Sequence, residues 1–317
     1  MLGRMFGIPF DQDGILLRRD AVRLGLDDNW LLRMRRAGAL IRIRQGAYAD
    51  PGIWLRQTPA EQHVTLSRAV LRQYDDRVAL SHASAHVIRG GPDWGLDLAT
   101  VNLTNLLGRG DRRQAGVTHH RGRTRAADVT RLDGHWITAP ARTAVETPAT
   151  LDIVPAICVL DWTLHQGLAT TEQLAWYVAH PLREWAGSVH LPTAVERACP
   201  ASESVGETRT RALLEDAGLQ PEPQWEVRHP SGAVAGRVDF LLRDLGLMIE
   251  FDGYVKYGRL LKPGQSINDV VLAERRRELL LEELTGYRMF RLIWSDLDRR
   301  QRTIDRIRRA AARRVSA

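Results

Sequence analysis

Three acidic residues interrupt apolar stretches in the last third of the chain. Asp239 lies between two apolar residues, and Glu250 and Asp252 lie on either side of Phe251. Burying a carboxylate in an apolar strand costs free energy unless a partner offsets its charge, and a divalent cation is the obvious partner. Carboxylate oxygens suit Mg²⁺ or Mn²⁺, ions that polarise a phosphoryl oxygen and make a nucleophile of bound water. The pattern therefore predicts a catalytic centre that uses Mg²⁺ or Mn²⁺.

These acids need a sheet to bring them together. The hydrophobic pattern predicts a helix over residues 205–217 and strands over residues 224–229, 235–242 and 247–252. Glu250 and Asp252 are two residues apart on a strand, so they face the same side. If the second and third strands pair across the turn between them, Asp239 lies near the same place. A fourth carboxylate, Glu207 on the helix, could then hold a metal-bound water or a second ion.

A basic helix and a fourth strand are predicted after these acids. Four leucines recur at roughly helical spacing and are expected to pack against the sheet: Leu272, Leu279, Leu280 and Leu284. Glu274 precedes three arginines, and this stretch is predicted to begin a basic helix that follows a phosphate backbone. Residues 287–294 form the fourth predicted strand.

The whole C-terminal pattern resembles the PD-(D/E)XK nuclease superfamily, specifically its branch similar to very-short-patch-repair endonucleases. The resemblance rests on Ser-x-x-Glu-x-x-x-Arg from Ser204, Val-Asp-Phe from Val238, Ile-Glu-Phe-Asp-Gly-Tyr from Ile249 and Gly-Tyr-Arg-Met-Phe-Arg-Leu-Ile-Trp from Gly286. It implies a restriction-endonuclease-like α/β/α domain that hydrolyses DNA phosphodiester bonds. It also implies that Asp239 and Glu250 are the metal ligands and that Glu207 is the helix carboxylate.

One position departs from the superfamily pattern. A lysine usually follows the Glu by two residues, and this chain has Asp252 there. All but two of the 45 lysines and arginines are arginine, and both lysines, Lys256 and Lys262, lie close behind. A lysine can lose its proton when its pKa is lowered, whereas an arginine cannot, so Lys256 is the candidate for the missing cation. The alternative is an incidental surface lysine. The predicted catalytic residues are Glu207, Asp239, Glu250, Asp252 and Lys256.

Residues 11–50 indicate a different chemistry. Their pattern predicts a helix around residues 16–24, a turn, a second helix over residues 29–37 and a hairpin that bends at Gln45 and Gly46. Two helices followed by a hairpin form a winged helix-turn-helix. Five arginines are predicted to contact DNA phosphates: Arg33, Arg35, Arg36, Arg42 and Arg44. The alternative is that they only solvate a small domain.

The middle of the chain alternates predicted helices and strands. Helices are expected over residues 59–74, 141–146 and 154–166, and strands over residues 99–104, 116–120 and 136–138. His82 and His86 have a spacing that can bind a metal on a helix, but structural roles are favoured because no acidic partner follows. His119 and His120 are adjacent on a strand and therefore point to opposite faces. Residues 179–204 are the predicted linker to the last domain.

The first half of the chain resembles the AbiEi-type antitoxins of type IV toxin–antitoxin systems. This resemblance rests on residues 11–50, on Ala-Leu-Ser-His-Ala-Ser-Ala from Ala79 and on Ile-Thr-Ala-Pro-Ala-Arg-Thr-Ala from Ile137. It implies that the winged helix binds and represses a promoter and that a cognate toxin is a further partner.

Composition narrows the classes of partner. A formal charge of +7 at pH 7 makes nucleic acid the first partner to consider. Cys158 and Cys199 form neither a disulfide framework nor a metal-binding spacing. The N-terminus lacks the apolar core of a signal peptide, and no stretch approaches the run of about 18 apolar residues that spans a bilayer. The sequence therefore predicts a cytoplasmic protein that binds DNA, with no membrane partner and no specified oligomeric state.

The predicted fold is α/β multidomain. A winged helix-turn-helix occupies residues 1–52, a mixed α/β middle domain and linker occupies residues 53–200, and the nuclease-like domain occupies residues 201–317. Two functions stay open. One is a metal-dependent DNA endonuclease, which the buried carboxylates favour. The other is a non-catalytic transcriptional regulator or antitoxin, which the missing lysine at position 252 favours.

Overall fold

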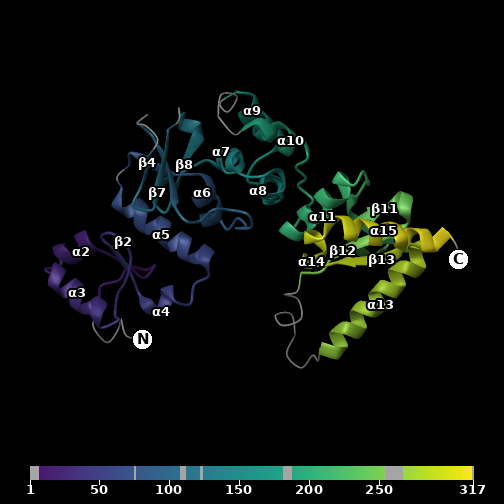
Figure 1. The fold of residues 1–317 in the computed structure, drawn as a ribbon, viewed down its shortest axis with the longest axis horizontal. Helices are drawn as coiled ribbons and strands as arrows, with labels where there is room; N and C mark the ends of the chain where they lie inside the picture. The colour runs from purple at the N-terminus through teal and green to yellow at the C-terminus, as the bar shows by residue number, and fades with distance from the viewer. Residues whose placement is uncertain are drawn as a thin grey trace. The chain divides into compact units, whose positions relative to one another are not determined.

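The computed structural model describes residues 7–74, 76–107, 112–121, 124–180, 188–253 and 267–315. In these ranges the chain is a mixed α/β protein with three sheets (Figure 1). It divides into two compact units, one of Met1–Thr163 and Gly167–Glu196, the other of Leu164–Gln166 and Arg197–Ala317. The further division of the first unit at residue 52 stays a prediction. Within the described ranges, no helix is both long and apolar enough to cross a membrane.

The first unit begins with two helices and a small sheet. The elements are β1 (Ile15–Leu17), α2 (Arg18–Arg23), α3 (Asp28–Arg36), β2 (Ile41–Arg44) and β3 (Ala47–Ala49). β3 lies between β1 and β2 and is antiparallel to both. The Asp27 side chain accepts a hydrogen bond from the Trp30 backbone N–H at 2.7 Å, which caps the start of α3. Leu16, Leu31 and Leu40 belong to one buried core, so the opposite side of α3 faces solvent.

The rest of the first unit is built on a six-stranded sheet in the order β6-β7-β5-β4-β9-β8. Its strands are β4 (Val78–Leu80), β5 (Val101–Asn105), β6 (Arg112–Gln114), β7 (Val117–Arg121), β8 (Val129–Leu132) and β9 (His135–Thr138). Its helices are α4 (Pro51–Trp54), α5 (Pro59–Gln73), α6 (His82–Ile88), α7 (Pro140–Glu146), α8 (Ile153–His165), α9 (Thr171–Ala179) and α10 (Leu191–Glu196). Thr58 and Glu61 form a capping box that starts α5. The helices and strands that the sequence predicts for the middle of the chain are confirmed to within a few residues.

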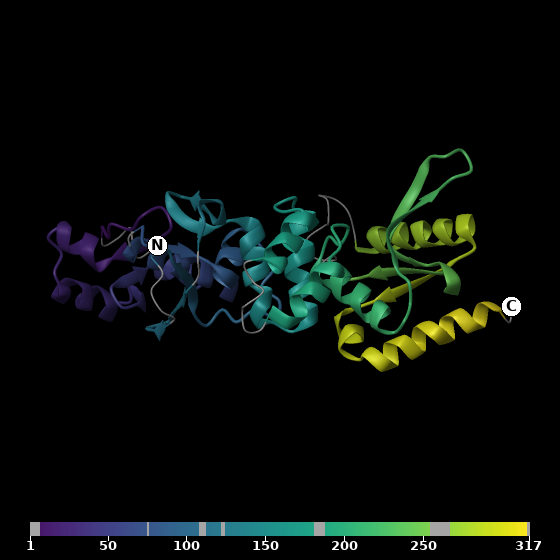
Figure 2. The same ribbon diagram turned by 90° about the horizontal axis from the view of Figure 1, so that it is seen from above.

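The second unit is a sheet with helices on both faces. Its elements are α11 (Val205–Asp216), β10 (Glu222–Arg228), β11 (Val234–Leu242), β12 (Leu247–Phe251), α13 (Ile267–Thr285), β13 (Arg288–Leu292), α14 (Trp294–Asp298) and α15 (Arg300–Val315). The order is β10-β11-β12-β13, antiparallel except that β12 and β13 run parallel. One core joins the sheet to α11, α14 and α15, and another joins it to α13. Figure 2 shows α13 and α15 on opposite sides of this sheet.

Three predictions of local structure are wrong. The helix predicted around residues 16–24 begins only at Arg18, because Leu16 and Leu17 belong to β1 and pair with β3. Residues 188–196 lie in the predicted linker but form a short 3-10 turn and α10. On α13, Leu272, Leu279 and Leu280 are exposed, whereas Leu284 packs against the core as predicted and the fully buried leucine is Leu281.

Candidate functional site

Four arginines gather on α3 and the following hairpin. Arg33, Arg35 and Arg36 lie in the last turns of α3, Arg42 lies on β2, and all four are exposed. They are the N-terminal arginine set. Over the described part of the chain, no carboxylate lies within ion-pair distance of any of them, whereas Arg18 on α2 is paired with Asp28 at 2.6 Å. A helix C-terminus favours cations, which accounts for the three arginines of α3 but not for Arg42 on β2. The set is a cationic surface whose arginines form no ion pair with a described carboxylate.

Arg44, the fifth arginine predicted to contact DNA, lies differently from these four. Its guanidinium carbon is 5.9 Å from the centroid of the Tyr74 ring at the end of α5. Its Nε and Nη1 atoms are buried, and no described residue hydrogen-bonds to them. Arg44 therefore faces the middle sheet, not the solvent side that carries the N-terminal arginine set.

Asp239 and Glu250, the predicted metal ligands, lie side by side in the C-terminal sheet. Phe240 pairs with Ile249, and this register continued by one residue brings Asp239 beside Glu250. Asp239 Oδ2 accepts a hydrogen bond from the Phe251 backbone N–H at 2.7 Å. The structure thus brings the two acids together, as the sequence predicts.

Glu250 is held by two guanidinium groups. Its Oε1 lies 2.8 Å from Arg277 Nη2 and its Oε2 lies 3.6 Å from Arg291 Nη2. Both arginines also pair with Glu274, and Arg291 pairs with Glu278. Burial disfavours the charged form of Arg277, but the hydrogen bonds and negative charges of Glu250 and Glu274 together outweigh burial and raise its pKa. These five residues form a half-buried C-terminal ion-pair cluster.

The other predicted catalytic residues have separate surroundings. Glu207 accepts hydrogen bonds from Ser204 Oγ at 2.7 Å, from the Glu203 N–H at 3.0 Å and from Gln224 Nε2 at 2.8 Å. Asp252 Oδ1 is buried without a hydrogen-bond partner among the described residues. Lys256 lies outside the described residues. Across the described ranges, no group of three or more His, Cys, Asp or Glu side chains is placed to hold a metal ion.

Gln224 is a polar residue of this site that the sequence did not single out. Its neighbours on β10 pair with Phe240 and Val238, so Gln224 lies at the level of Asp239. Its φ of 52° is unusual for a residue other than glycine, and its side chain donates to Glu207. A lone glutamine in a strand carries no sequence signal, so only the fold identifies it.

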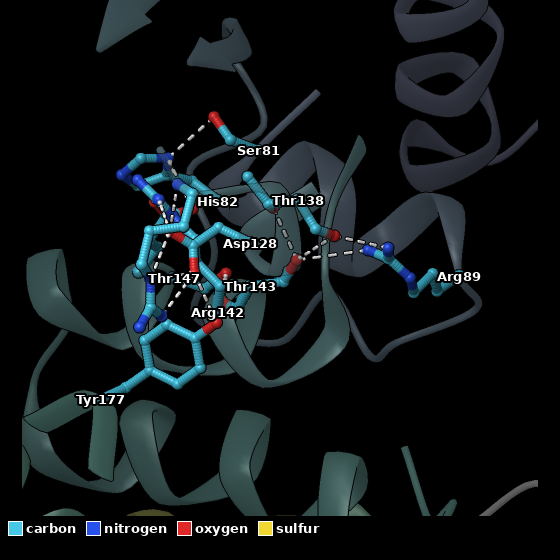
Figure 3. A network of polar contacts seen from close by, with 11 residues as sticks. Ser81, His82, Arg89, Asp128, Thr138, Arg142, Thr143, Thr147 and Tyr177 are labelled. Atoms are coloured by element: carbon cyan, nitrogen blue, oxygen red, sulfur yellow. Dashed lines mark hydrogen bonds and ion pairs between the residues drawn. The ribbon is translucent and has the colours of Figure 1, made fainter. Parts of the chain in front are cut away.

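A second constellation that the sequence did not predict lies buried beside the middle sheet (Figure 3). Arg142 Nη1 donates to Asp128 Oδ2 at 2.9 Å, and Arg142 Nε donates to Glu146 Oε1 at 2.6 Å. Tyr177 Oη donates to Asp128 Oδ1 at 2.9 Å. Asp128, Arg142 and Glu146 are 1%, 4% and 0% exposed. The network links η1 (Ala126–Asp128), α7 and α9 and is closed to solvent, which is typical of a structural role.

Burial and hydrogen bonding shift the pKa values of Asp128 and Tyr177 in this network. Burial alone would raise the pKa of Asp128, but hydrogen bonds from Arg125 and Tyr177 and the charge of Arg142 lower it to about 2. Burial and the hydrogen bond to Asp128 raise the pKa of Tyr177 to about 12. Asp128 therefore stays a carboxylate and Tyr177 a phenol across the physiological pH range.

The histidines flagged by spacing do not form a metal pair. His82 Nδ1 lies 3.0 Å from Ser81 Oγ and its ring stacks on His120, whereas His86 packs edge-on against Trp162. Burial lowers the pKa of His86 to about 4. His119 contacts Tyr74 and Asn105, whereas His120 contacts Asn102 and His82, which agrees with the prediction that adjacent residues of a strand point to opposite faces. The structural interpretation of these residues is therefore favoured.

Part of the N-terminal region is similar to a known protein family. Residues 10–49 match the family of AbiEi antitoxin transcriptional regulators. Two uncharacterized proteins, from two strains of Mycobacterium tuberculosis, are each 26% identical over 255 residues, which is 76% of this chain and 89% of the relative. The N-terminal resemblance is thus confirmed over residues 10–49, and the C-terminal resemblance to nucleases stays a prediction.

Proposed function

We propose that the chain is a DNA-binding transcriptional regulator of the AbiEi antitoxin type. The observation that carries this proposal is the N-terminal arginine set, which lies inside the segment that matches these regulators. α2, α3 and the β2–β3 hairpin serve as a winged helix-turn-helix, with α3 in the major groove and the hairpin as the wing. Exposed arginines without carboxylate partners bind phosphates without first breaking an ion pair, and they release the counterions of the DNA.

The regulator acts in the cytoplasm on a promoter, and its relationship to AbiEi antitoxins makes a toxin its second partner. The test measures binding of the purified chain to a labelled fragment of its own upstream DNA by fluorescence anisotropy. Arg33→Gln and Arg42→Gln are each expected to weaken binding roughly tenfold, because a charge-assisted hydrogen bond is lost. Arg23→Gln, which removes an arginine that Asp20 already pairs, is the control and is expected to change binding less than about twofold. Equal affinities for all four proteins would overturn the proposal.

A second candidate function is the metal-dependent endonuclease. Two observations favour it: Asp239 lies beside Glu250, and Asp252 Oδ1 is buried without a described partner. In the arrangement described, however, the donor set does not fit a divalent cation, because Arg277 and Arg291 occupy the carboxylate of Glu250.

The endonuclease is tested by incubating supercoiled plasmid with the wild-type chain in Mg²⁺ or Mn²⁺. Cleavage that disappears in Asp239→Asn, with stability unchanged, would support it. Cleavage that persists in both Asp239→Asn and Glu250→Gln would exclude these residues, and DNA binding without cleavage would leave the regulator as the sole function.

A further inference from the structure

A pocket of about 290 Å³ opens beside the middle sheet, next to the hairpin that carries Arg44. Its wall comes from the end of α5 with Tyr74, and its floor comes from β5 and β7 with Asn105 and His119. Arg77 and Arg112 complete the polar lining. None of the described residues that line it carries a carboxylate.

Hydrogen bonds fix the floor of this pocket. His119 Nε2 lies 3.2 Å from Tyr74 Oη and His119 Nδ1 lies 3.1 Å from Asn105 Oδ1. Both bonds are satisfied when a neutral His119 donates from Nδ1 and accepts at Nε2. Burial lowers the pKa of His119, and the charges of Arg112 and Arg44 lower it further. His119 is therefore a neutral support, and the positive charge of the pocket comes from arginine.

Three arginines place positive charge in or beside this pocket. Arg112 is the register partner of His119 on edge strand β6, and Arg77 precedes β4. Arg44 approaches the Tyr74 ring with two buried nitrogens that no described residue satisfies. Asp76, the residue before Arg77, pairs with Arg131 at 2.9 Å. Arg44 is not among the described residues that line the pocket, so it adds positive charge beside an anion bound there rather than a direct contact.

We propose that this pocket binds a phosphate group, with Arg112 and Arg77 as its ligands and Arg44 adding charge from the hairpin. Guanidinium groups match the oxygens of a phosphate in geometry and charge. The phosphate comes either from the DNA backbone beside the wing or from a free phosphate ester. In the first case the inference rests on the proposed function and extends the DNA contact onto the middle sheet. In the second case it stands independently of DNA binding.

The chain offers a matched pair of variants for the test. Arg112 lines the pocket and is the register partner of His119 on the neighbouring strand. The next residue, Arg113, is also exposed, but its register partner is Thr118 and it is not among the residues that line the pocket. Arg112→Gln and Arg113→Gln remove the same charge from the same edge strand. The full-length proteins are titrated with inorganic phosphate and adenosine monophosphate by calorimetry, and with duplex DNA by anisotropy.

We expect Arg112→Gln to weaken the binding of one of these ligands roughly fivefold to tenfold. The affinities of Arg113→Gln should stay within about twofold of wild type. Loss of phosphate or nucleotide binding with DNA affinity unchanged identifies a free ester. Loss of DNA affinity with no heat from either small ligand identifies the DNA backbone. The inference is overturned if Arg112→Gln matches Arg113→Gln in every titration. Failure of the proposed function alone would appear differently, as wild-type DNA affinity in Arg33→Gln.

Discussion

Two regions of this chain concentrate arginine and use it in opposite ways. On α3 and β2, the N-terminal arginine set is exposed and has no described carboxylate within reach. On α13 and β13, Arg277 and Arg291 are half-buried and each pairs with at least two glutamates. An unpaired surface arginine is available to a phosphate, whereas a paired one must first give up its carboxylate. Availability, rather than the number of arginines, therefore distinguishes a DNA-binding surface from a stabilising cluster.

The buried network around Arg142 is the extreme case of a paired arginine. Replacing Arg142 by Met leaves Asp128 and Glu146 buried without their shared cation, so we expect a loss of about 3–5 kcal/mol in the free energy of unfolding. Arg125→Met is the control, because Arg125 binds the same Asp128 but its side chain is 49% exposed, and about 1 kcal/mol is expected there. Urea denaturation measures both. Equal losses would mean that burial does not set the strength of these pairs.

The pH dependence of stability sharpens the same point. The folded-state pKa of Asp128 is lowered from 3.8 to about 2, so its stabilisation is present above pH 4 and disappears as the pH falls towards 2. The difference in unfolding free energy between wild type and Asp128→Asn should shrink by about 2 kcal/mol over that window. Glu146, whose pKa burial raises, titrates in both proteins and largely cancels in the difference. A difference that stays constant from about pH 6 to 2 would contradict the assignment.

Substitution of Glu250 tests the C-terminal ion-pair cluster. Glu250→Ala removes one partner from two half-buried arginines, which keep their bonds to Glu274, so a loss of about 1–2 kcal/mol in unfolding free energy is expected. Glu226→Ala on β10 is the matched control, because its pair with Arg228 is exposed, and it should stay within about 0.5 kcal/mol. Thermal and urea unfolding compare the two. If Glu250→Ala leaves the free energy of unfolding unchanged, the cluster adds no stability.

The smallest expected effect comes from releasing a paired arginine near α3. Asp28→Asn frees Arg18, whose ion pair is exposed on both sides, so the free energy of unfolding should hardly change. DNA affinity should rise about twofold to threefold, since one more arginine becomes available to phosphate. Asp244→Asn makes the same charge change at an exposed position before β12. If both variants bind DNA equally well, net charge and not the local release of Arg18 accounts for any gain.

Local patterns predicted the helices and strands well and the pairing of charges poorly. Alternation of apolar residues predicted β11 and β12, and the register that brings Asp239 beside Glu250 follows from one short turn. Arg277 reaches Glu250 across 27 residues of sequence, and nothing local in either residue indicates that pair. The approach of Arg44 to Tyr74 likewise depends on how α5 packs against the small sheet.

Ambiguous periodicity explains the wrong predictions of local structure. The apolar run Ile15–Leu17 fits a strand as well as a helix, and only its pairing with β3 decides. On α13 the leucines occur on several sides of the helix, so spacing alone did not identify Leu281 as the buried one. Asp128, Arg142 and Tyr177 lie on three different elements, and no local sequence motif predicts that they form a network.

The central claim is tested most directly by the salt dependence of DNA binding in two matched double variants. Arg35→Gln with Arg36→Gln removes adjacent exposed arginines from α3, and Arg275→Gln with Arg276→Gln removes an adjacent exposed pair from α13. The slope of log Kd against log salt should fall by about 1–2 for the α3 variant and stay at the wild-type value for the α13 variant. A slope that falls only in the α13 variant, or equally in both, would contradict the assignment of DNA binding to the N-terminal arginine set.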